Sequence, residues 1–366
     1  MTTLKATDLK LAIDKVNKAI FIDKGIIVSN YIFIEAKEKR LRIHITNIDN
    51  HFETFLPIEG EDFQVILSAD LFIKYINKLN DTKDIIFEKT ESGLKISQGN
   101  SRAEFAMSDI TEEDFLLFNE IEKPSESELI KVDYEDLKNV MNYLPSAVDN
   151  NMYNPEYTCF VIGKDLAVST NSYKLCGLKI DLFKTETTYL LTHKLVKYMQ
   201  GLTETGDLYF GVNADGIHLI NDKVHILGLP YESDRTEKLM SAVRVLLSSN
   251  FENKIIIDKT LLADALDRLS IFINLETKTY AKMVVKNDSF ILYNVKGTGK
   301  EIIPITLEEG VENIENWTWH VDIRYFKALF DSLNGDKIVL SYSKDSNTIG
   351  LSDGVCNQIL ALSIVE

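Results

Sequence analysis

The sequence has 366 residues, of which 45% are hydrophobic and 26% are charged, so it is a folded protein rather than a disordered or low-complexity chain. Lys and Arg total 40 against 56 Asp and Glu, which gives a net charge of −16. This charge excludes a protein that coats nucleic acid with its whole surface, but not one that uses a restricted basic face. The cysteines Cys159, Cys176 and Cys356 form no CxxC pair, which argues against a disulfide scaffold and a thiolate zinc site. No run approaches the roughly 18 apolar residues of a membrane span, so we expect a cytoplasmic protein without a membrane partner.

The first pattern along the chain is a helical stripe that occurs six times, with apolar residues at positions i, i+4 and i+7. The stripes are Leu9/Ile13/Val16, Phe72/Ile76/Leu79, Leu137/Met141/Leu144, Leu195/Met199/Leu202, Leu262/Leu266/Leu269 and Phe326/Phe330/Leu333. They recur about every 60 residues, which indicates an internal repeat. We expect helices at 5–20, 69–80, 133–144, 192–202, 258–270 and 322–334.

Antiparallel strands are predicted between these helices. After every second helix comes a strand, a turn and a strand, at 85–87 with 93–96, 208–210 with 216–219, and 338–340 with 349–351. The other helices lead into longer strand runs, such as 31–34 with 41–45. Polar seams at 122–128 and 248–253 divide the repeat into three parts. We therefore expect an α+β protein with domains at 1–123, 124–250 and 251–366.

No catalytic constellation is visible. Residues 297–300 (Gly-Thr-Gly-Lys) are not a phosphate loop, because Asn294 and Glu301 stand where that motif needs Gly and Ser or Thr, and a hairpin turn is the better interpretation. Asp109 with 112–114 could hold a divalent cation, although such acidic runs are more often solvated loops. The six histidines have no HxH or HxxxH spacing, and His44 and His218 fit strand patterns. We expect no enzyme activity, no cofactor and no metal.

The charge pattern points to the helices instead. Five of the six carry a Lys just after the first apolar anchor and off the stripe, so its ammonium group points away from the packing face. These residues are Lys10, Lys74, Lys138, Lys197 and Lys327. Repeated lysines on one face would suit a phosphate backbone, but lysine is also common on exposed helix faces in general, and both interpretations stay open.

Several stretches resemble one known family. They are 101–108 followed by 113–115; 169–175, which is similar to the family's Ala-Thr-Asp-Gly-His-Arg-Leu; 321–325 with Leu329; and the apolar end at 359–364. The resemblance is to the bacterial DNA polymerase III beta subunit, the sliding clamp, and it spans the whole chain. The sequence departs from the family at 172–174 (Ser-Tyr-Lys for Gly-His-Arg), at 233–236, and at Ser363, where the family has Pro.

The resemblance implies three tandem clamp domains, each of two helices packed on antiparallel sheets, that form a half-ring. Two chains joined head to tail would close a ring around duplex DNA. The expected partners are double-stranded DNA, a second copy of the chain, and the replicative polymerase and clamp loader, which bind through short peptide motifs. A clamp-fold scaffold protein that does not load onto DNA is the alternative, and a hydrolase with an unrecognised site is a third possibility.

Three sets of site residues are expected, the first from the charge pattern of the helices and the other two from the resemblance. The DNA-facing set is Lys10, Lys74, Lys138, Lys197, Arg268, Arg324 and Lys327. The partner-peptide pocket, between the second and third domains, is Tyr157, Thr170, Leu175, Leu239, Tyr280, Asp322, Tyr325, Leu360, Leu362 and Ile364. The dimer interface is Tyr75, Leu79, Phe105 and Met107 of the first domain with Ile271 and Phe272 of the third. Leu79, Phe105 and the three terminal apolar residues could equally be ordinary core.

Overall fold

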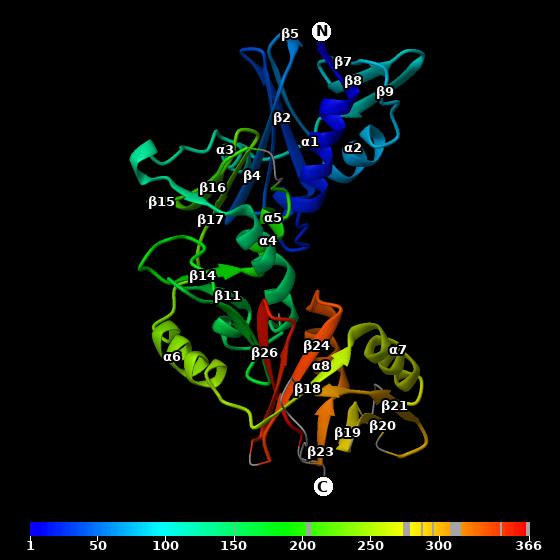
Figure 1. Ribbon diagram of the computed structural model, residues 1–366. Helices are drawn as coiled ribbons and strands as arrows, with labels where there is room; N and C mark the ends of the chain where they lie inside the picture. The colour runs from blue at the N-terminus through cyan, green and yellow to red at the C-terminus, as the bar shows by residue number, and fades with distance from the viewer. Residues whose placement is uncertain are drawn as a thin grey trace. The chain divides into compact units, whose positions relative to one another are not determined.

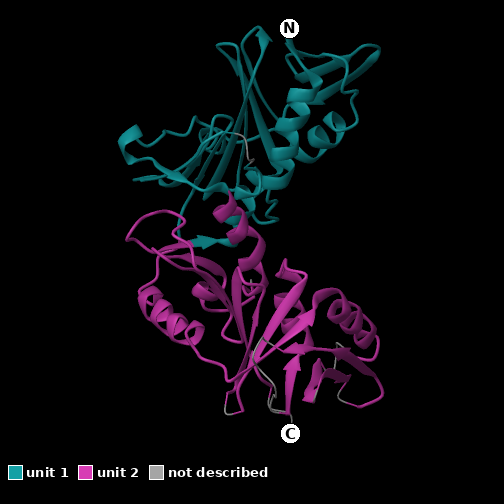
Figure 2. Cartoon of the chain, in the orientation of Figure 1, with its two compact units in different colours: residues 1–134, 191–230 teal, residues 135–190, 231–366 magenta. Residues whose placement is uncertain are grey.

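The computed structural model describes residues 1–149, 151–202, 206–273, 279–286, 288–294, 296–307, 316–344 and 346–363. The chain forms two compact units, shown in Figure 2: unit 1 is Met1–Tyr134 with Leu191–Pro230, and unit 2 is Glu135–Leu190 with Tyr231–Glu366. Each unit combines helices with antiparallel sheets, which confirms the predicted α+β class. The finer division into three domains, with boundaries after residues 123 and 250, stays a prediction.

Unit 1 contains two sheets. The five-stranded sheet has the order β5-β1-β7-β8-β9, with β1 (Thr2–Leu4), β5 (Glu59–Gly60), β7 (Ile85–Lys89), β8 (Gly93–Gln98) and β9 (Ser101–Ala106). The eight-stranded sheet has the order β10-β15-β16-β17-β4-β3-β2-β6, with β2 (Tyr31–Lys37), β3 (Arg40–Thr46), β4 (Asn50–Pro57), β6 (Phe63–Ser68), β10 (Ile130–Val132), β15 (Leu208–Asn213), β16 (Gly216–Ile220) and β17 (Val224–Gly228). In this second sheet, β4 pairs with β17 across a long stretch of sequence.

The helices of unit 1 are α1 (Ala6–Ala19), α2 (Ala69–Ile76), α3 (Glu112–Leu116) and α5 (His193–Met199), with short 3₁₀ helices at Ile27–Asn30 and Glu126–Glu128. Helices α1, α2 and α5 bury apolar residues against the sheets, whereas α3 contains no buried residue. Helix α1 packs on β4 and beside α2 (Figure 1). The stripe residues Ile13 and Phe72 are fully buried, and the Phe72 ring meets Phe87 of β7 edge to face. The predicted stripe is therefore the face that packs on the sheets.

Unit 2 also contains two sheets. The larger has the order β14-β11-β12-β13-β26-β25-β24-β18-β22, with β11 (Cys159–Ile162), β12 (Ala167–Thr170), β13 (Lys174–Leu178), β14 (Tyr189–Thr192, which continues into unit 1), β18 (Asn253–Asp258), β22 (Thr306–Leu307), β24 (Lys337–Tyr342), β25 (Thr348–Ser352) and β26 (Cys356–Ala361). The smaller has the order β21-β20-β19-β23, with β19 (Tyr280–Lys286), β20 (Ser289–Asn294), β21 (Lys300–Pro304) and β23 (Trp317–Asp322). Its helices are α4 (Tyr134–Tyr143, which begins in unit 1), α6 (Thr236–Leu247), α7 (Lys259–Ser270) and α8 (Ile323–Ser332), with 3₁₀ helices at Leu144–Ser146 and Pro155–Tyr157.

All six predicted helices are present as α1, α2, α4, α5, α7 and α8. Three of them begin at side-chain caps, because Thr192, Asp258 and Asp322 accept hydrogen bonds from the first-turn backbone of α5, α7 and α8. The predicted hairpins β2–β3, β7–β8, β15–β16 and β24–β25 are confirmed, and residues 297–299 lie between the paired strands β20 and β21, with Lys300 as the first residue of β21.

Two helices were not predicted. Helix α3 contains the acidic run 112–114 in its first turn, where Thr111 accepts a hydrogen bond from the Asp114 backbone and the helix dipole favours negative charge. The prediction of a solvated loop there is thus wrong in its secondary structure. Helix α6 is the second, and it borders the candidate site. Among the described residues, no helix combines the length and apolar character that crossing a bilayer requires.

Candidate functional site

A cavity of about 210 Å³ in unit 2 contains four of the predicted pocket residues. They are Tyr157, Thr170, Leu175 and Leu239. The wall also includes Ser172, Tyr173, Lys174, Ala242, Val243, Leu246, Thr348, Ile359 and Ala361. These residues come from the 3₁₀ helix Pro155–Tyr157, helix α6, the β12–β13 hairpin and the strands β25 and β26, so segments on both sides of the predicted boundary after residue 250 meet here. The arrangement is an apolar slot with a few polar groups at its edge, which is the usual form of a peptide- or ligand-binding site.

The floor of the slot is part of the hydrophobic core. Leu175, Val243 and Ile359 are buried in one cluster with the β11–β12 strands, and Leu239 packs against it from α6. Because these side chains are held by the core, the slot is formed before any ligand arrives.

A tight turn at 170–174 forms one edge of the cavity. The Asn171 carboxamide oxygen accepts hydrogen bonds from the backbone of Tyr173 and Lys174, at 3.1 and 3.0 Å. Ser172 has a left-handed backbone with φ of 70°. This is the position where the resembling family has Gly, which adopts such a backbone without steric cost. The chain keeps the turn with a residue that fits it less well.

Tyr173 and Lys174 of this turn contact residues outside it. Tyr173 stacks on Tyr325 of α8, with ring centroids 5.8 Å apart and planes 23° from parallel. Lys174 is buried, and its ammonium group donates to the Ser146 carbonyl at 2.5 Å and lies 5.5 Å from the centre of the Tyr325 ring. Burial lowers the pKa of Lys174. Tyr325 therefore adjoins the cavity through Tyr173 without being among its lining residues.

Asp322 and Tyr280 lie beside Tyr325 rather than in the cavity wall. Asp322 caps α8 and accepts hydrogen bonds from Arg324 at 2.7 Å and from the Thr279 hydroxyl at 2.9 Å. Burial alone would raise the pKa of Asp322, but these hydrogen bonds outweigh it and lower the pKa. Tyr280 is the register partner of Asp322 in the β19–β23 pair. This carboxylate therefore serves first to cap the N-terminus of helix α8.

The face of strand β26 that lines the cavity is the one opposite to the predicted face of Leu360 and Leu362. Ile359 and Ala361 line the cavity, whereas Leu360 is fully buried on the other side of β26 and neither it nor Leu362 is a lining residue. Alternation along the strand was predicted, and it is present. The register decides the face: Ile359 pairs with Leu175, which already lies in the cavity floor. Ile364 lies outside the described residues.

The predicted DNA-facing cations are on helices as expected, and six of the seven have an acidic partner. The pairs are Lys10 with Asp81, Lys74 with Asp70, Lys138 with Glu135, Arg268 with Glu301, Arg324 with Asp322, and Lys327 with Asp267 and Asp331. Lys197 donates to the Gln200 side chain at 2.9 Å. Six of these seven charges are thus balanced locally, so a phosphate contact made by any of the six must compete with a carboxylate.

The predicted interface residues divide into exposed and buried ones. In unit 2, Ile271 and Phe272 follow α7 and are 79% and 52% exposed. In unit 1, Met107 is exposed and Phe105 is half-buried, with its ring against that of Tyr75 at 5.4 Å. Leu79 is only 8% exposed and belongs to the core of unit 1. Its side chain is therefore better placed to support the unit than to contact a partner.

Each exposed apolar group lies near the edge of a sheet. Phe105 is in β9, the last strand of the five-stranded sheet, and Met107 follows it. On unit 2, the Phe272 ring approaches Gly299, directly before β21, which is an edge strand of the four-stranded sheet. Edge strands with exposed apolar neighbours are suited to pairing with another chain.

Known proteins share both part of this sequence and the whole of this fold. Residues 2–119 match the family described as "DNA polymerase III beta subunit, N-terminal domain". No curated protein sequence matches the chain. A DNA polymerase sliding clamp from Pseudomonas aeruginosa has the same fold, with a TM-score of 0.80 at 12% identity over 100% of both chains. The chain has the sliding-clamp fold.

Other clamps match it in the same way. A putative DNA polymerase III beta subunit from Eubacterium rectale has a TM-score of 0.80 at 16% identity, covering 99% of this chain and 98% of that one. The Bacillus subtilis sliding clamp has a TM-score of 0.79 at 16% identity, covering 100% and 99%. The resemblance seen in the sequence is confirmed at the level of the fold, and identities of 12% and 16% show that the chain has diverged from these clamps.

Proposed function

We propose that the protein is a non-catalytic processivity clamp of the bacterial cytoplasm: a homodimeric ring that encircles duplex DNA and tethers a replicative DNA polymerase. The clamp loader and other replication or repair proteins would use the same cavity between α6, β13 and β26. The observation that carries the proposal is the correspondence with sliding clamps over the full length of the chain. Fold alone does not fix function, so the proposal also depends on the site.

The cavity supports partner binding because it is preformed and mainly apolar. A short peptide could insert apolar side chains between Leu246 on one side and Thr170 and Leu175 on the other. Short motifs that dock in this way gain most of their affinity from a few buried anchors. The Tyr173–Tyr325 stack would extend the apolar wall at one end.

The locally paired cations are compatible with a ring that slides. A ring holds DNA by enclosing it, so it needs no tight grip on phosphates. Cations that already have carboxylate partners would bind the backbone weakly, and the net charge of −16 would discourage DNA from binding elsewhere on the surface.

The same ion pairs favour one alternative, a clamp-fold scaffold that does not load onto DNA. If the carboxylates permanently neutralise the helix cations, no basic surface remains for a duplex. The two functions differ in one measurable property, which is whether the protein becomes linked to DNA topologically.

The test is retention on circular and linear DNA. The protein is loaded onto nicked circular plasmid by the clamp loader of its own host and passed through a sizing column, before and after the plasmid is cut once. We expect co-elution with the circle, resistance to added salt, and loss after cutting. No retention on either form would support the scaffold, and salt-sensitive retention on both forms would mean ordinary binding; either result would overturn the clamp.

A further inference from the structure

Unit 1 buries a carboxylate among histidines in the middle of its eight-stranded sheet. Glu53 of β4 is fully buried and has His44 of β3 as its register partner on one side and His225 of β17 on the other. Arg42 donates to Glu53 Oε1 at 2.7 Å. Glu53 Oε2 and His225 Nδ1 are 3.8 Å apart, which is longer than a hydrogen bond, and neither atom has a hydrogen-bond partner among the described residues, although the Ile121 backbone N–H approaches Glu53 closely enough to lower its pKa. A buried acceptor without a donor is costly, so this gap needs an explanation.

The protonation of His225 can be worked out from its neighbours. The Asp215 backbone N–H donates to the Asn213 side-chain oxygen at 2.9 Å, which fixes that atom as oxygen. His218 Nε2 lies 2.8 Å from the same oxygen and must therefore carry a proton and donate it. His218 Nδ1 is then the unprotonated nitrogen of a neutral ring.

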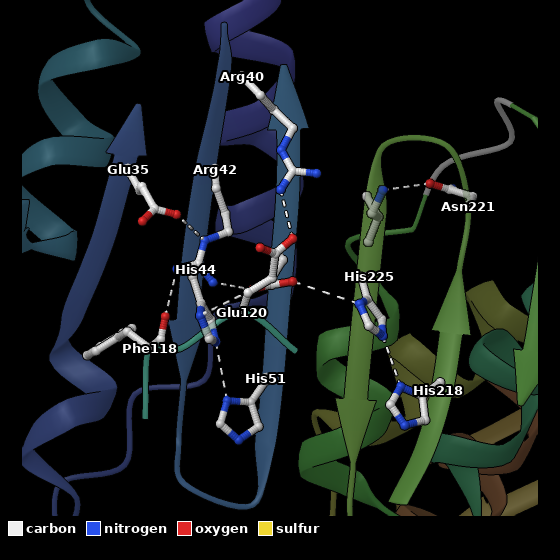
Figure 3. A network of polar contacts seen from close by, with 12 residues as sticks. Glu35, Arg40, Arg42, His44, His51, Phe118, Glu120, His218, Asn221 and His225 are labelled. Carbon is white, nitrogen blue, oxygen red and sulfur yellow. Dashed lines mark hydrogen bonds and ion pairs between the residues drawn. The ribbon is translucent and has the colours of Figure 1, made fainter. Parts of the chain in front are cut away.

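The same logic extends to the next ring. His225 Nε2 lies 2.9 Å from His218 Nδ1, so His225 Nε2 carries the proton of that hydrogen bond. In a neutral His225, Nδ1 is thus a bare acceptor, and it faces Glu53 Oε2. Two acceptors facing each other repel unless a proton lies between them. Figure 3 shows the two histidine pairs, His44 with His51 and His218 with His225, on neighbouring parts of this sheet.

Other charged groups surround this pair. Those facing it or adjoining it are Arg42 and His44 of β3, Glu35 of β2, His51 of β4, His218 of β16, and Arg40, Glu120 and Lys123 around the end of α3 and β3. Arg42 is shared between Glu53 and Glu35, so its single charge does not balance both carboxylates. No three His, Cys, Asp or Glu side chains among the described residues are grouped to hold a metal ion, so a cation does not fill the gap.

We propose that Glu53 carries a titratable proton, that its carboxyl group turns toward His225 Nδ1 to close the 3.8 Å gap with a hydrogen bond, and that this shared proton fastens strand β4 to strand β17. Loss of the proton as the pH rises through neutrality leaves a carboxylate facing a nitrogen lone pair and loosens the strand pair. By the predicted boundary after residue 123, β4 belongs to the first domain and β17 to the second. The proton would thus set the stiffness of the joint between two domains, whether or not the chain loads onto DNA.

The pKa directions agree with this assignment. Burial raises the pKa of Glu53 to about 7 despite the lowering effect of Arg42, and burial lowers the pKa of His225 to about 3, so the proton resides on the carboxyl group. A carboxyl whose pKa is higher in the folded state stabilises the fold at low pH. This contribution is lost as the pH rises from the unfolded value of 4.5 through about 7.

The first test observes the imidazoles directly. In protein labelled with ¹⁵N-histidine, we expect His225 and His218 near pH 6.5 to show one protonated and one unprotonated ring nitrogen, with Nδ1 unprotonated in both. We also expect the His225 Nδ1 signal to shift with a midpoint near pH 7 as Glu53 ionises. A His225 ring that is protonated on both nitrogens, or that shows no shift between pH 6 and 8.5, would overturn the proposal.

The second test measures strand opening by hydrogen exchange in peptides from β4 and β17. In Glu53→Gln the side-chain amide is a permanent hydrogen-bond donor toward His225 Nδ1. The histidines still titrate in this variant, but residue 53 no longer contributes to the pH dependence of strand opening. We expect the ratio of opening constants, wild type over Glu53→Gln, to rise about tenfold from pH 6 to pH 8.5. The matched control is Glu88→Gln, a carboxylate that pairs with Lys95 in the other sheet of unit 1 and whose pKa is lowered, so its ratio should stay flat. A flat ratio for Glu53→Gln, or an equal rise for Glu88→Gln, would refute the mechanism; if Glu53→Gln does not fold, the ¹⁵N measurement decides.

Discussion

At the scale of single residues, Ser172 shows how the divergent turn of the cavity is maintained. Its φ of 70° is in the left-handed region, where a side chain other than that of Gly crowds the backbone. Hydrogen bonds from the Asn171 carboxamide to the next residues hold the turn in place. The turn therefore stores local strain that a different residue would relieve.

Ser172→Gly should stabilise the protein. Relief of the left-handed strain contributes roughly 1–2 kcal/mol and the greater freedom of Gly in the unfolded chain offsets about half of it, so we expect a net gain of about 0.5–1 kcal/mol in the free energy of unfolding. The urea midpoint measures this gain. The control is Ser248→Gly, where φ is −88° and there is no strain to relieve, so that variant should gain nothing. A lower midpoint for Ser172→Gly would show that the turn is not strained.

Residue identities alone could place some buried groups but not their partners. The strand patterns around His44 and His218 predicted sheet residues, and both are buried in β3 and β16. Their neighbours could not be predicted, because His225 meets Glu53 only through the pairing of β17 with β4. Spacing rules search for local motifs, and this cluster is assembled from segments about 170 residues apart in the chain.

At the scale of elements, the six helices were predictable because each buries a simple stripe. Helix α6 has the same stripe, Leu239, Val243 and Leu246, but it falls outside the regular spacing of the repeat. A search for the stripe without the spacing would have found it. The face of β26 is a different case: alternation gives two faces, and only the pairing of Ile359 with Leu175 selects the one in the cavity.

Helix α6 offers a matched pair of variants to test the cavity. Leu246 lines the cavity and is 41% exposed, whereas the neighbouring Val245 is 70% exposed and is not among the lining residues. Leu246→Asp should weaken binding of a peptide from the C-terminus of the host's polymerase by at least about tenfold, since it places a charge against buried apolar anchors. Val245→Asp adds the same charge to the same turn and should leave affinity within about twofold. Fluorescence anisotropy with a labelled peptide measures both. Equal effects of the two variants would point to general electrostatics, and no effect of Leu246→Asp would move the site elsewhere.

At the scale of the whole molecule, the sequence predicted the fold and four of the residues that line the cavity, but not the charge balance of the helices. Lys327 pairs with Asp267 of the preceding helix, and Arg268 pairs with Glu301 of a strand. Such pairs depend on which elements pack together, so a count of lysines along helices overestimates the basic surface. The predicted DNA-facing residues remain a prediction that the retention experiment tests.

The exposed side chains of Ile271 and Phe272 predict that the protein forms a dimer. The proposed ring needs Ile271 and Phe272 to be buried by a second copy, beside the sheet edge formed by β21. Removing most of two apolar side chains costs about 3 kcal/mol or more, which weakens association by at least about a hundredfold. Native mass spectrometry at micromolar concentration should give a dimer of about 83 kDa for the wild type and the 41.7 kDa monomer for Ile271→Ala/Phe272→Ala. Leu261→Ala removes a comparably exposed side chain from the other end of α7 and should remain dimeric. A wild-type monomer would remove the ring, and a double variant that stays dimeric would place the interface on another surface.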